Sequence, residues 1–508
     1  MSVARVSSRA QLGLAAPRVE VEVHLGGGLP TFNIVGMPAT AVRESKDRVR
    51  AALATSGFEY PAGRITVNLS PADLPKEGCR YDLPIALGIL VASGQSNLSE
   101  STLASTEFYG ELGLAGELKP IRGVLLAAAH AAREGRGIVV PMANTREAHL
   151  AGSVEVRGAF SLLDACGVCA AHGALVSAQS DAPALPAPSL AVPDLADVRG
   201  QATAKRALLV AAAGAHSLLL LGPPGTGKSM LAQRLPGLLP DLDASDALDV
   251  AAIASASSRG FEPRDYGRRP FRAPHHTAAA GAIIGGGPQA RPGEVSLAHR
   301  GVLFLDELPE FNRSVLESLR EPLESGVVAI SRAAMRLQYP ARFQLVAAMN
   351  PCPCGYLGDP SGRCRCPPTI IARYRARISG PLLDRIDLRV VVPAIANEEL
   401  LMEAGVHPAE TPVIAARVRA ARERQVTRAG KLNADLDGAE TQAVCRIDRI
   451  GRRLIAQARS RMDLSARGVH RVMRVARTIA DLEGSDALGV AHLAEALQLR
   501  RGLQDGGS

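Results

Sequence analysis

The sequence predicts an α/β protein in three parts: a mixed α and β domain, a parallel-sheet domain and a helical domain. Short apolar strands alternate with helices between residues 195 and 393, which is typical of a parallel sheet. The pattern over residues 394–508 is helical and rich in arginine. Residues 177–194 are rich in alanine, proline and serine without periodicity, so we interpret them as a linker that follows a first domain at 1–176.

Strands and helices are both expected in the first domain. Alternating apolar residues predict strands, and apolar residues spaced three or four apart predict helices. The expected strands are Val19–Leu25 and Ile65–Leu69 with a hairpin at Gly110–Leu118, and the expected helices are Glu44–Ser56, Asp82–Ala92 and Val124–Arg133.

The segment after the linker alternates between the two patterns and then becomes helical. We expect a helix at Ala204–Ala213, a helix that begins at Lys228, and buried strands at Ser217–Leu221, Val302–Leu305 and Gln344–Ala348. In the last part we expect helices at Asn397–Ala404, Ala415–Ala429, Arg449–Met462, Val469–Glu483 and Val490–Leu499.

The composition is that of an ordinary globular protein, with 47% hydrophobic and 21% charged residues among 508. No stretch reaches about 18 uninterrupted apolar residues, and the N-terminus lacks the apolar core of a signal peptide. Eight cysteines are too few for a disulfide scaffold in a chain of this length. We therefore expect a cytoplasmic protein that does not contact membranes.

The net charge of +8 is concentrated toward the C-terminus. Between Val413 and Arg477, sixteen lysines and arginines stand against six acidic residues, a surplus of ten. Such a region is either a contact for the phosphate backbone of nucleic acid or a solvated helical face. Aromatic residues make up only 3% of the chain, with no tryptophan, which argues against base stacking as the main mode of binding.

The most informative motif directly follows the apolar segment Ser217–Leu221. It reads GPPGTGKS and comprises Gly222, Pro223, Pro224, Gly225, Thr226, Gly227, Lys228 and Ser229. This pattern lets backbone N–H groups turn around phosphates, while Lys228 adds positive charge and Ser229 offers a hydroxyl to Mg²⁺. A strand before the loop and a helix after it are the setting that the motif needs, so we expect ATP and Mg²⁺ to bind here.

Two further strand ends supply other parts of an ATP-hydrolysing site. Asp306 and Glu307 end the run VLFLDE, and we expect Asp306 to hold Mg²⁺ and Glu307 to polarise the attacking water. Asn350 ends the run LVAAMN, where it either orients that water or opens a turn before Pro351.

Two arginines are candidates for contacts with the γ-phosphate of a neighbouring subunit. Arg385, in LLDRID, is the candidate arginine finger, or else it forms a salt bridge with Asp384 or Asp387. Arg467, in LSARGVHRV, begins a helix and is the candidate for a second sensor, although other arginines lie nearby.

Four cysteines lie close together in the pattern C-x-C-x9-C-x-C, at Cys352, Cys354, Cys364 and Cys366. Four thiolates could hold a structural Zn²⁺ tetrahedrally, although the usual spacing is C-x2-C, and a reduced loop without metal is the alternative. Cys166 and Cys169 form a C-x2-C pair without a second pair, so we interpret them as buried thiols.

Several longer segments resemble known proteins. The segments APHHTAAAGAIIGGGPQARPGEVSLAHRGVLFLDELPEF (273–311), AAMNPCPCGYLGDPSGRCRC (347–366) and ARTIADLEG (476–484) resemble the magnesium-chelatase-like branch of AAA+ ATPases. The segments VNLSPADLPKEGCRYDLPIALGIL (67–90) and GELGLAGELKPIRG (110–123) resemble the Lon-protease-like domain that is fused to that module. Together they resemble the YifB/ComM family of competence-related branch-migration helicases over nearly the whole chain.

The resemblance implies a fold and a partner that the motifs alone do not give. It implies an AAA+ module with a helical lid, assembled as a hexameric ring with DNA in its channel. An insertion at approximately 273–294 and a hairpin within Val327–Arg342 would face that channel. The candidate DNA contacts are then His275, His276, Arg332 and Arg336, with a hydrogen-bonding role inside the fold as the equal alternative for the two histidines.

The Lon-like domain is not expected to be a peptidase. A Lon-type site pairs a serine nucleophile with a lysine base. Arg80 takes the place of the serine in PKEGCRYD, and Leu125 takes the place of the lysine in PIRGVLLA. We therefore expect this domain to support the ring or to bind a partner or DNA.

The expected function is that of an ATP-dependent DNA translocase. It would promote branch migration during recombination of incoming DNA in natural transformation. One alternative is the ATPase subunit of a metal chelatase, and another is a protein-remodelling ATPase. A response of ATP hydrolysis to DNA would separate the first from the other two.

Overall fold

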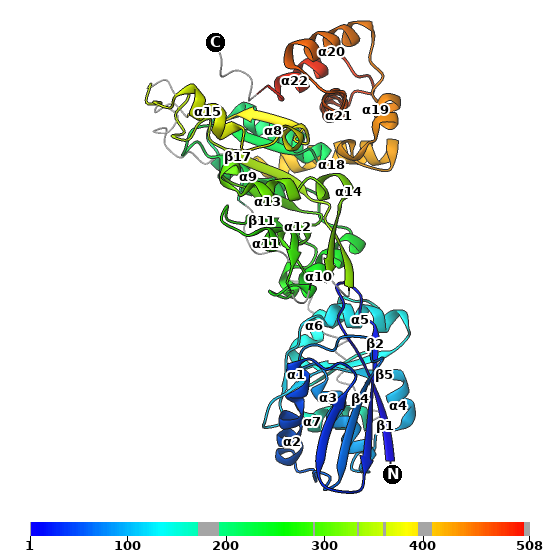
Figure 1. Cartoon of the computed structure of the whole chain (residues 1–508). Coiled ribbons are helices and arrows are strands. Elements are labelled where there is room, and N and C mark those ends of the chain that lie inside the picture. Colours follow the sequence, from blue (N-terminus) through cyan, green and yellow to red (C-terminus); the bar gives the residue numbers. More distant parts are fainter. Residues whose placement is uncertain are drawn as a thin grey trace. The chain divides into compact units, whose positions relative to one another are not determined.

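The computed structural model describes residues 2–170, 193–287, 290–332, 335–358, 362–394 and 409–501, which form two compact units (Figure 1). The expected helix Asn397–Ala404 and most of the expected linker 177–194 lie outside the described residues. Unit 1 is drawn from residues 1–189, 244–267 and 333–337, and unit 2 is drawn from residues 190–243, 268–332 and 338–508.

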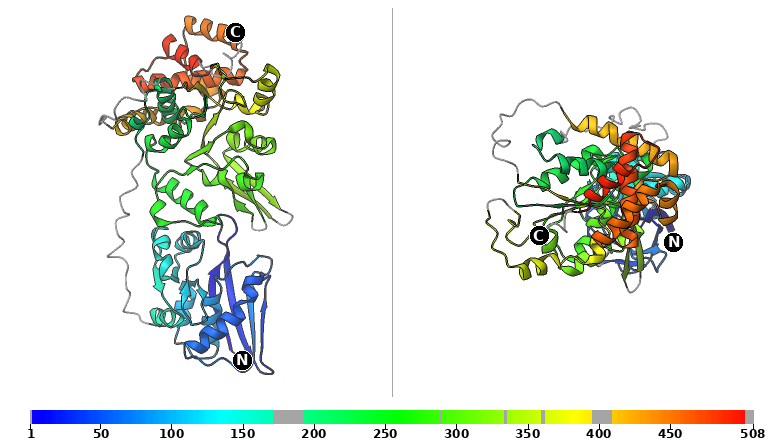
Figure 2. Two further views of the ribbon diagram at one scale, coloured as in Figure 1. Left: turned by 90° about the vertical axis from the view of Figure 1, so that its left-hand side faces the viewer. Right: turned by 90° about the horizontal axis from the view of Figure 1, so that it is seen from above.

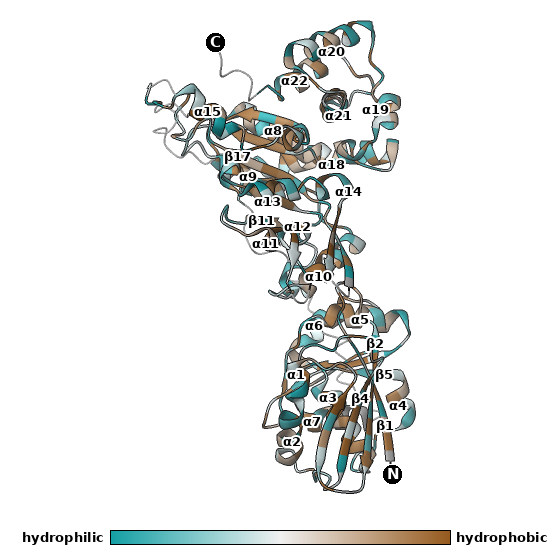
Figure 3. Cartoon of the chain, in the orientation of Figure 1, coloured by the Kyte–Doolittle hydropathy of each residue, from teal (hydrophilic) through white to brown (hydrophobic). Residues whose placement is uncertain are grey.

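Unit 1 is built on a seven-stranded sheet, and buried and less buried residues alternate along its strands β2 and β4. Valines of the second strand point alternately into the core, with Val19, Val21 and Val23 fully buried. Brown strands in Figure 3 show the same apolar character along this sheet. The order is β3-β4-β2-β1-β5-β8-β9, with β1 at Ser2–Arg9, β2 at Arg18–Gly26, β3 at Thr31–Val35, β4 at Arg64–Ser70, β5 at Thr106–Phe108, β8 at Gly137–Pro141 and β9 at Val156–Ala159.

Helices and a small hairpin complete unit 1, and the sequence predicted the longest of them. Helix α3 packs against β1 and β2 and is buried on nearly all sides, which explains its continuous apolar sequence. The helices are α1 (Thr40–Arg43), α2 (Ser45–Thr55), α3 (Asp82–Ala92), α4 (Glu100–Ser105), α5 (Val124–Arg133), α6 (Thr145–His149) and α7 (Leu162–Ala170), and the hairpin is β6 (Glu111–Leu112) with β7 (Leu118–Lys119).

One helix that lies within the expected parallel-sheet segment belongs to unit 1 instead. Helix α10 (Ala244–Ala256) packs against α5. Its Ala252 and Ala256 lie in a small apolar cluster with Leu126, and its Ser255 Oγ donates a hydrogen bond to Glu147 Oε1 at 2.7 Å. Contacts between side chains far apart in the sequence decide this placement, so local patterns could not reveal it.

Unit 2 contains a parallel five-stranded sheet, as the sequence predicted. Its order is β11-β14-β17-β10-β18, and every neighbouring pair is parallel. Because β10, β14 and β17 lie side by side and run in the same direction, the residues that follow them meet at one edge of the sheet. The strands are β10 (Leu218–Leu221), β11 (Phe271–Arg272), β14 (Val302–Leu305), β17 (Gln344–Met349) and β18 (Leu388–Val391).

The helices of residues 409–501 share one apolar core with this sheet. Helix α8 (Ala202–Gly214) contacts both α18 (Thr411–Ala429) and α21 (Ala466–Glu483). Figure 2 shows the C-terminal helices, in orange and red, gathered together: α19 (Gly438–Val444), α20 (Arg449–Met462), α21 and α22 (Val490–Gln498). Across the described residues we find no helix of sufficient length and apolarity to span a membrane.

Two short hairpins occur where the family resemblance places loops that face DNA. The first pairs β12 (Gly285–Gly286) with β13 (Arg291–Pro292) after helix α11 (Ala280–Ile284). The second pairs β15 (Val327–Arg332) with β16 (Met335–Pro340), within the expected range.

Candidate functional site

The phosphate-binding motif forms a tight loop between strand β10 and helix α9 (Lys228–Leu238). Gly225 and Gly227 have φ angles of +77° and +85°, which favour glycine. At Gly222 a Cβ atom would collide with the carbonyl oxygen of Val392. The loop therefore depends on its glycines, and it ends at a helix N-terminus whose free N–H groups suit a phosphate.

Lys228 lies in the centre of this loop and is almost fully buried. Its Nζ donates hydrogen bonds to the carbonyl oxygens of Gly222 at 2.8 Å and Pro223 at 2.7 Å, and to Asn350 Oδ1 at 3.2 Å. Burial lowers the pKa of Lys228, and the carboxylates of Asp306 and Glu307 oppose this change. The structure thus brings residues from three separate motifs to one ammonium group.

Ser229 and Asp306 form the pair of oxygen ligands that a hard cation prefers. The Ser229 hydroxyl donates to Asp306 Oδ2 at 2.7 Å, and the other carboxylate oxygen accepts the backbone N–H of Glu307 at 2.9 Å. These residues fit the expected magnesium site, because a hydroxyl and a carboxylate already face one another. Glu307 has a φ angle of +51°, an uncommon conformation for a residue with a side chain.

His276 contacts the candidate catalytic glutamate, which the sequence did not predict. Its Nδ1 lies 3.1 Å from Glu307 Oε2, and its ring packs at 4.1 Å from the ring of His275. The Nδ1 of His275 lies 2.9 Å from Thr277 Oγ1. Both histidines therefore have partners inside the fold, as the hydrogen-bonding alternative expects, and a contact with DNA stays a prediction.

A cavity of about 320 Å³ lies beside these side chains. Ser229, Asp306 and Glu307 line it from one side, and both histidines line it from the loop that follows β11. The residues expected to hold magnesium and to activate water therefore border a common space.

The two expected trans-acting arginines meet at an acid that sequence reasoning missed. Arg385 Nη2 is ion-paired with Glu324, and Arg467 Nη1 lies 3.3 Å from the same Glu324 oxygen. The ion pair of Arg385 is therefore with Glu324 and not with Asp384 or Asp387. Asp387 instead accepts from Arg471 at 2.6 Å. Glu324 follows no motif, so no signal in the sequence could have identified it.

The other two arginines proposed for DNA flank the turn of the β15–β16 hairpin. Arg332 is the last residue of β15, and its side chain lies outside the described atoms. Arg336 is exposed on β16. Both remain predictions.

In unit 1 the two residues expected to replace the Lon-type pair have structural contacts. The buried Arg80 donates to Gln11 Oε1 at 3.0 Å and to the carbonyl of Arg122 at 2.8 Å. Leu125 is fully buried in α5. Burial raises the pKa of the neighbouring Cys79 thiol to about 11, which disfavours the thiolate that a nucleophile requires. The absence of peptidase activity stays a prediction.

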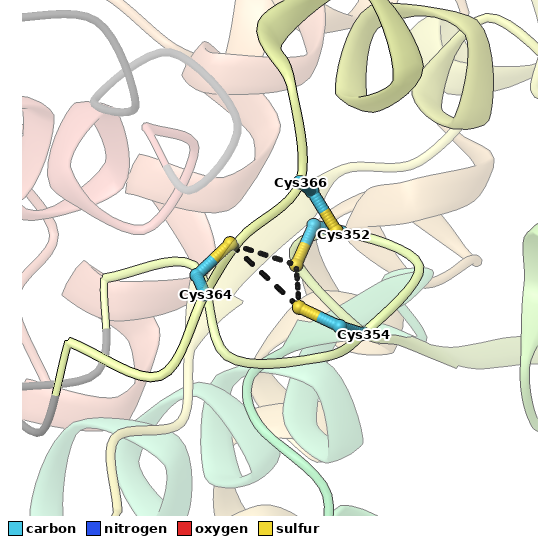
Figure 4. A group of neighbouring side chains, drawn as sticks. All are labelled: Cys352, Cys354, Cys364 and Cys366. Carbon is cyan, nitrogen blue, oxygen red and sulfur yellow. Dashed lines mark hydrogen bonds between the residues drawn. The ribbon is translucent and has the colours of Figure 1, made fainter.

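The four cysteines after Asn350 come together, as Figure 4 shows. The sulfur of Cys352 lies 3.3 Å from that of Cys354 and 3.7 Å from that of Cys364, and Cys354 and Cys364 are also 3.7 Å apart. All four sulfur atoms, including that of Cys366, lie within 4.8 Å of one another. These distances exceed the roughly 2.05 Å of a disulfide, so the group is a set of free thiols that could hold a metal ion.

Three family models match most of the chain. Residues 194–400 match the model for magnesium chelatase, subunit ChlI. Residues 21–144 match the model for subunit ChlI of Mg-chelatase, and residues 409–500 match that for the C-terminal part of the subunit. Both compact units and the C-terminal helices are thus covered.

Two relatives match over nearly the full length of the chain, and a third matches over part of it. Competence protein ComM of Haemophilus influenzae is 47% identical over 502 residues, which cover 98% of each chain. The uncharacterized protein YifB of Escherichia coli is 46% identical over 506 residues, covering 98% of this chain and 97% of the relative. The magnesium-chelatase 38 kDa subunit of Rhodobacter capsulatus is 28% identical over 169 residues, covering 30% of this chain and 48% of the relative. The chain therefore belongs to the YifB/ComM family of magnesium-chelatase-like proteins.

Proposed function

We propose that this protein is an ATP-hydrolysing AAA+ motor that moves branched DNA during recombination of incoming DNA, and that it acts as a hexameric ring in the cytoplasm. The observation that carries the proposal is the convergence of Lys228, Ser229, Asp306, Glu307 and Asn350 at one edge of a parallel sheet. Phosphoryl transfer requires positioning and charge neutralisation, and these residue types supply both.

The residues divide into binding and hydrolysing roles. Lys228 exchanges its hydrogen bonds with backbone carbonyls for bonds to the β- and γ-phosphates of ATP. Ser229 and Asp306 would hold Mg²⁺, which would neutralise phosphate charge when bound. Glu307 accepts a proton from the attacking water, and Asn350 orients that water.

Arg385 and Arg467 act on the ATP of the neighbouring subunit. They share Glu324 within one chain, where the Arg467 side chain is exposed and the Arg385 side chain is almost fully buried. Their positive charge would stabilise the transition state of the next subunit's reaction. Hydrolysis then depends on contact between subunits, which links it to ring assembly.

Two observations support DNA as the substrate. The name of the Haemophilus influenzae relative refers to competence. Helix α20 carries exposed arginines and no acidic residue, a surface that suits a phosphate backbone. Its exposed arginines are Arg449, Arg452, Arg453, Arg459 and Arg461.

We also propose that the cysteine cluster holds a structural Zn²⁺ ion. Four thiolates are the ligand set that zinc prefers. A tetrahedron with Zn–S bonds of roughly 2.3 Å has sulfur atoms about 3.8 Å apart. The sulfur distances among Cys352, Cys354 and Cys364, 3.3 to 3.7 Å, are close to this value, and the sulfur of Cys366 lies within 4.8 Å of the others.

The test of the motor is strand displacement on a three-stranded DNA, with and without ATP. We expect ATP-dependent displacement by the wild-type protein and none by Lys228→Ala, because this substitution removes the ammonium group that binds phosphate. Lys119→Ala is the matched control, since it removes a half-exposed lysine from unit 1. If DNA does not change the rate of ATP hydrolysis and no strand is displaced, the proposal is contradicted. A chelatase-like or protein-remodelling ATPase is then favoured.

A further inference from the structure

We infer that the metal bound by the four cysteines fixes Asn350 and the phosphate-binding loop in place, so that the rate of ATP hydrolysis depends on metal occupancy. This inference rests on the proposed zinc site and ATP site, and it extends the role of the metal from supporting a loop to controlling the reaction. Asn350 and Pro224 connect the two sites.

The first connection is through the chain itself. Strand β17 ends at Met349, Asn350 accepts the hydrogen bond from Lys228, and only Pro351 separates it from the buried Cys352. Consecutive Cα atoms are about 3.8 Å apart, and proline restricts its own φ angle. A fixed Cys352 sulfur therefore leaves Asn350 little freedom to move.

The second connection is a packing contact with the phosphate-binding loop. Residues 352–355 form a turn in which the Gly355 N–H donates to the carbonyl of Cys352 at 3.0 Å. Gly355 has a φ angle of +84°, and a Cβ atom there would lie 2.7 Å from Pro224 Cδ. The turn that carries Cys352 and Cys354 is thus packed directly against the loop that receives phosphate.

The third connection comes from the other end of the cysteine segment. Cys364 and Cys366 lead into helix α15 (Pro368–Arg375). Arg375 Nε donates to the carbonyl of Pro351 at 3.3 Å. The segment that follows Cys364 and Cys366 therefore contacts Pro351, the residue between Asn350 and Cys352.

The metal provides the strong interaction that closes this arrangement. Hydrogen bonds between thiols are weak, so four thiol groups alone hold two chain segments together only weakly. Zinc–thiolate bonds are far stronger, and structural zinc contributes directly to folding. Loss of the metal would let the two cysteine-bearing segments beside Asn350 separate. Strand β10, helix α9 and the rest of the phosphate-binding loop would stay in place, because other contacts hold them.

The experiment compares the wild-type protein with Cys354→Ser and Cys364→Ser, and with Cys79→Ser as a thiol control in unit 1. Zinc content is measured by elemental analysis, and ATP turnover is measured without DNA. We expect about one zinc ion per wild-type chain. For the two cluster variants we expect loss of zinc and a kcat lower by about 10-fold or more, because small displacements of positioning groups have such effects. Their KM for ATP should change much less than kcat, and Cys79→Ser should match the wild type.

A second measurement avoids variants that fold poorly. Chelator treatment of the wild-type protein under reducing conditions should lower kcat, and added Zn²⁺, but not Mg²⁺ alone, should restore it. Zinc-containing wild type with unchanged kcat after metal removal would overturn the inference while leaving the zinc proposal intact. A wild-type chain without zinc would overturn both. Because no DNA is present, neither result depends on whether the protein moves DNA.

Discussion

One carboxylate oxygen of Glu307, Oε2, lies 3.1 Å from Nδ1 of His276. This contact links the candidate water-activating residue to the loop that follows β11. The oxygen that faces His276 Nδ1 is occupied by this contact, so it is less available to a water molecule. The Glu307 side chain is about half exposed, at 52%, so release from His276 would leave it free to face water in the cavity. The histidine therefore restrains the residue that we propose to activate water.

We predict that His276→Ala raises ATP hydrolysis in the absence of DNA by several-fold. The physical reason is that Glu307 loses the partner that occupies its carboxylate. Hydrolysis rates with and without DNA measure the effect, and the stimulation by DNA should shrink because the basal rate is higher. His275→Ala is the control, since it removes the adjacent ring without removing the contact with Glu307. A lower basal rate in His276→Ala would show that His276 orients Glu307 rather than restraining it.

Motif spacing predicted which residues meet in the ATP site, but not their partners outside the motifs. Lys228, Ser229 and Asn350 follow recognisable strands, and parallel neighbouring strands end at the same edge. His276 contacts Glu307, and Glu324 contacts Arg385, only because loops and short helices fold together. Such contacts depend on tertiary structure, which no periodic pattern encodes.

At the scale of elements, helix α20 bears on whether the basic C-terminal region is a contact for nucleic acid or a solvated helical face. Several arginines of that region bind inside the fold: Arg422 donates to the carbonyl of Ala212, and Arg428 and Arg477 pair with Asp481. Those on α20 are exposed, while Ile455, Ala458 and Met462 form its buried face. The charge surplus is therefore partly structural, and five of the exposed arginines lie on the amphipathic helix α20. Other exposed arginines of the region lie elsewhere, at Arg417, Arg419, Arg446 and Arg467.

We predict that replacing Arg452 and Arg453 together with glutamine weakens DNA binding without unfolding the protein. Two positive charges leave an exposed face, so fewer counterions are released on binding. The slope of log affinity against log salt should fall by about 2, and the measurement is a salt titration of DNA affinity. Arg133→Gln, an exposed arginine at the end of α5, serves as control. Equal affinity and slope in the double variant would rule out α20 as a DNA surface.

The sequence predicted the long, strongly periodic elements best. Helices α3, α5 and α20 have the expected bounds, because each has a continuous apolar face or a clear end signal. Strands β11 and β18 were not predicted. Strand β11 has two residues, and β18 is a four-residue run beside the polar segment that contains Arg385. Short strands lack enough residues to show a period.

At the scale of the whole of unit 2, the buried Asp387 joins the sheet to the C-terminal helices. It accepts hydrogen bonds from Ser217 N–H at 3.1 Å, beside β10, and from Arg471 on α21 at 2.6 Å. Burial alone would raise the pKa of Asp387, but Arg471 and His216 outweigh it and hold the pKa well below its usual range. The carboxylate is therefore charged in the folded state throughout the physiological range.

We predict that acid destabilises the protein partly through Asp387. In the unfolded chain an aspartate has a pKa of about 3.9, so below that pH the unfolded state takes up a proton that the folded state does not. The contribution of Asp387 is thus full above about pH 4 and is lost as the pH falls further. Asp387→Asn should lower the free energy of unfolding near neutral pH by about 3–5 kcal/mol and reduce the pH dependence in acid. Denaturant titrations of both proteins across this range provide the measurement, and an unchanged acid slope would contradict the assignment.

Glu324 also has a consequence for symmetry. One carboxylate balances one positive charge, yet both Arg385 and Arg467 approach it, and Arg467 remains 73% exposed. Two copies that met through this corner about a twofold axis would place like charges together, which is unfavourable. Head-to-tail association places the same charge against a different surface of the next copy, and such contacts give a ring where the rotation between copies closes and a filament where it does not. The charge at this corner therefore disfavours twofold pairing through it before any ligand is bound.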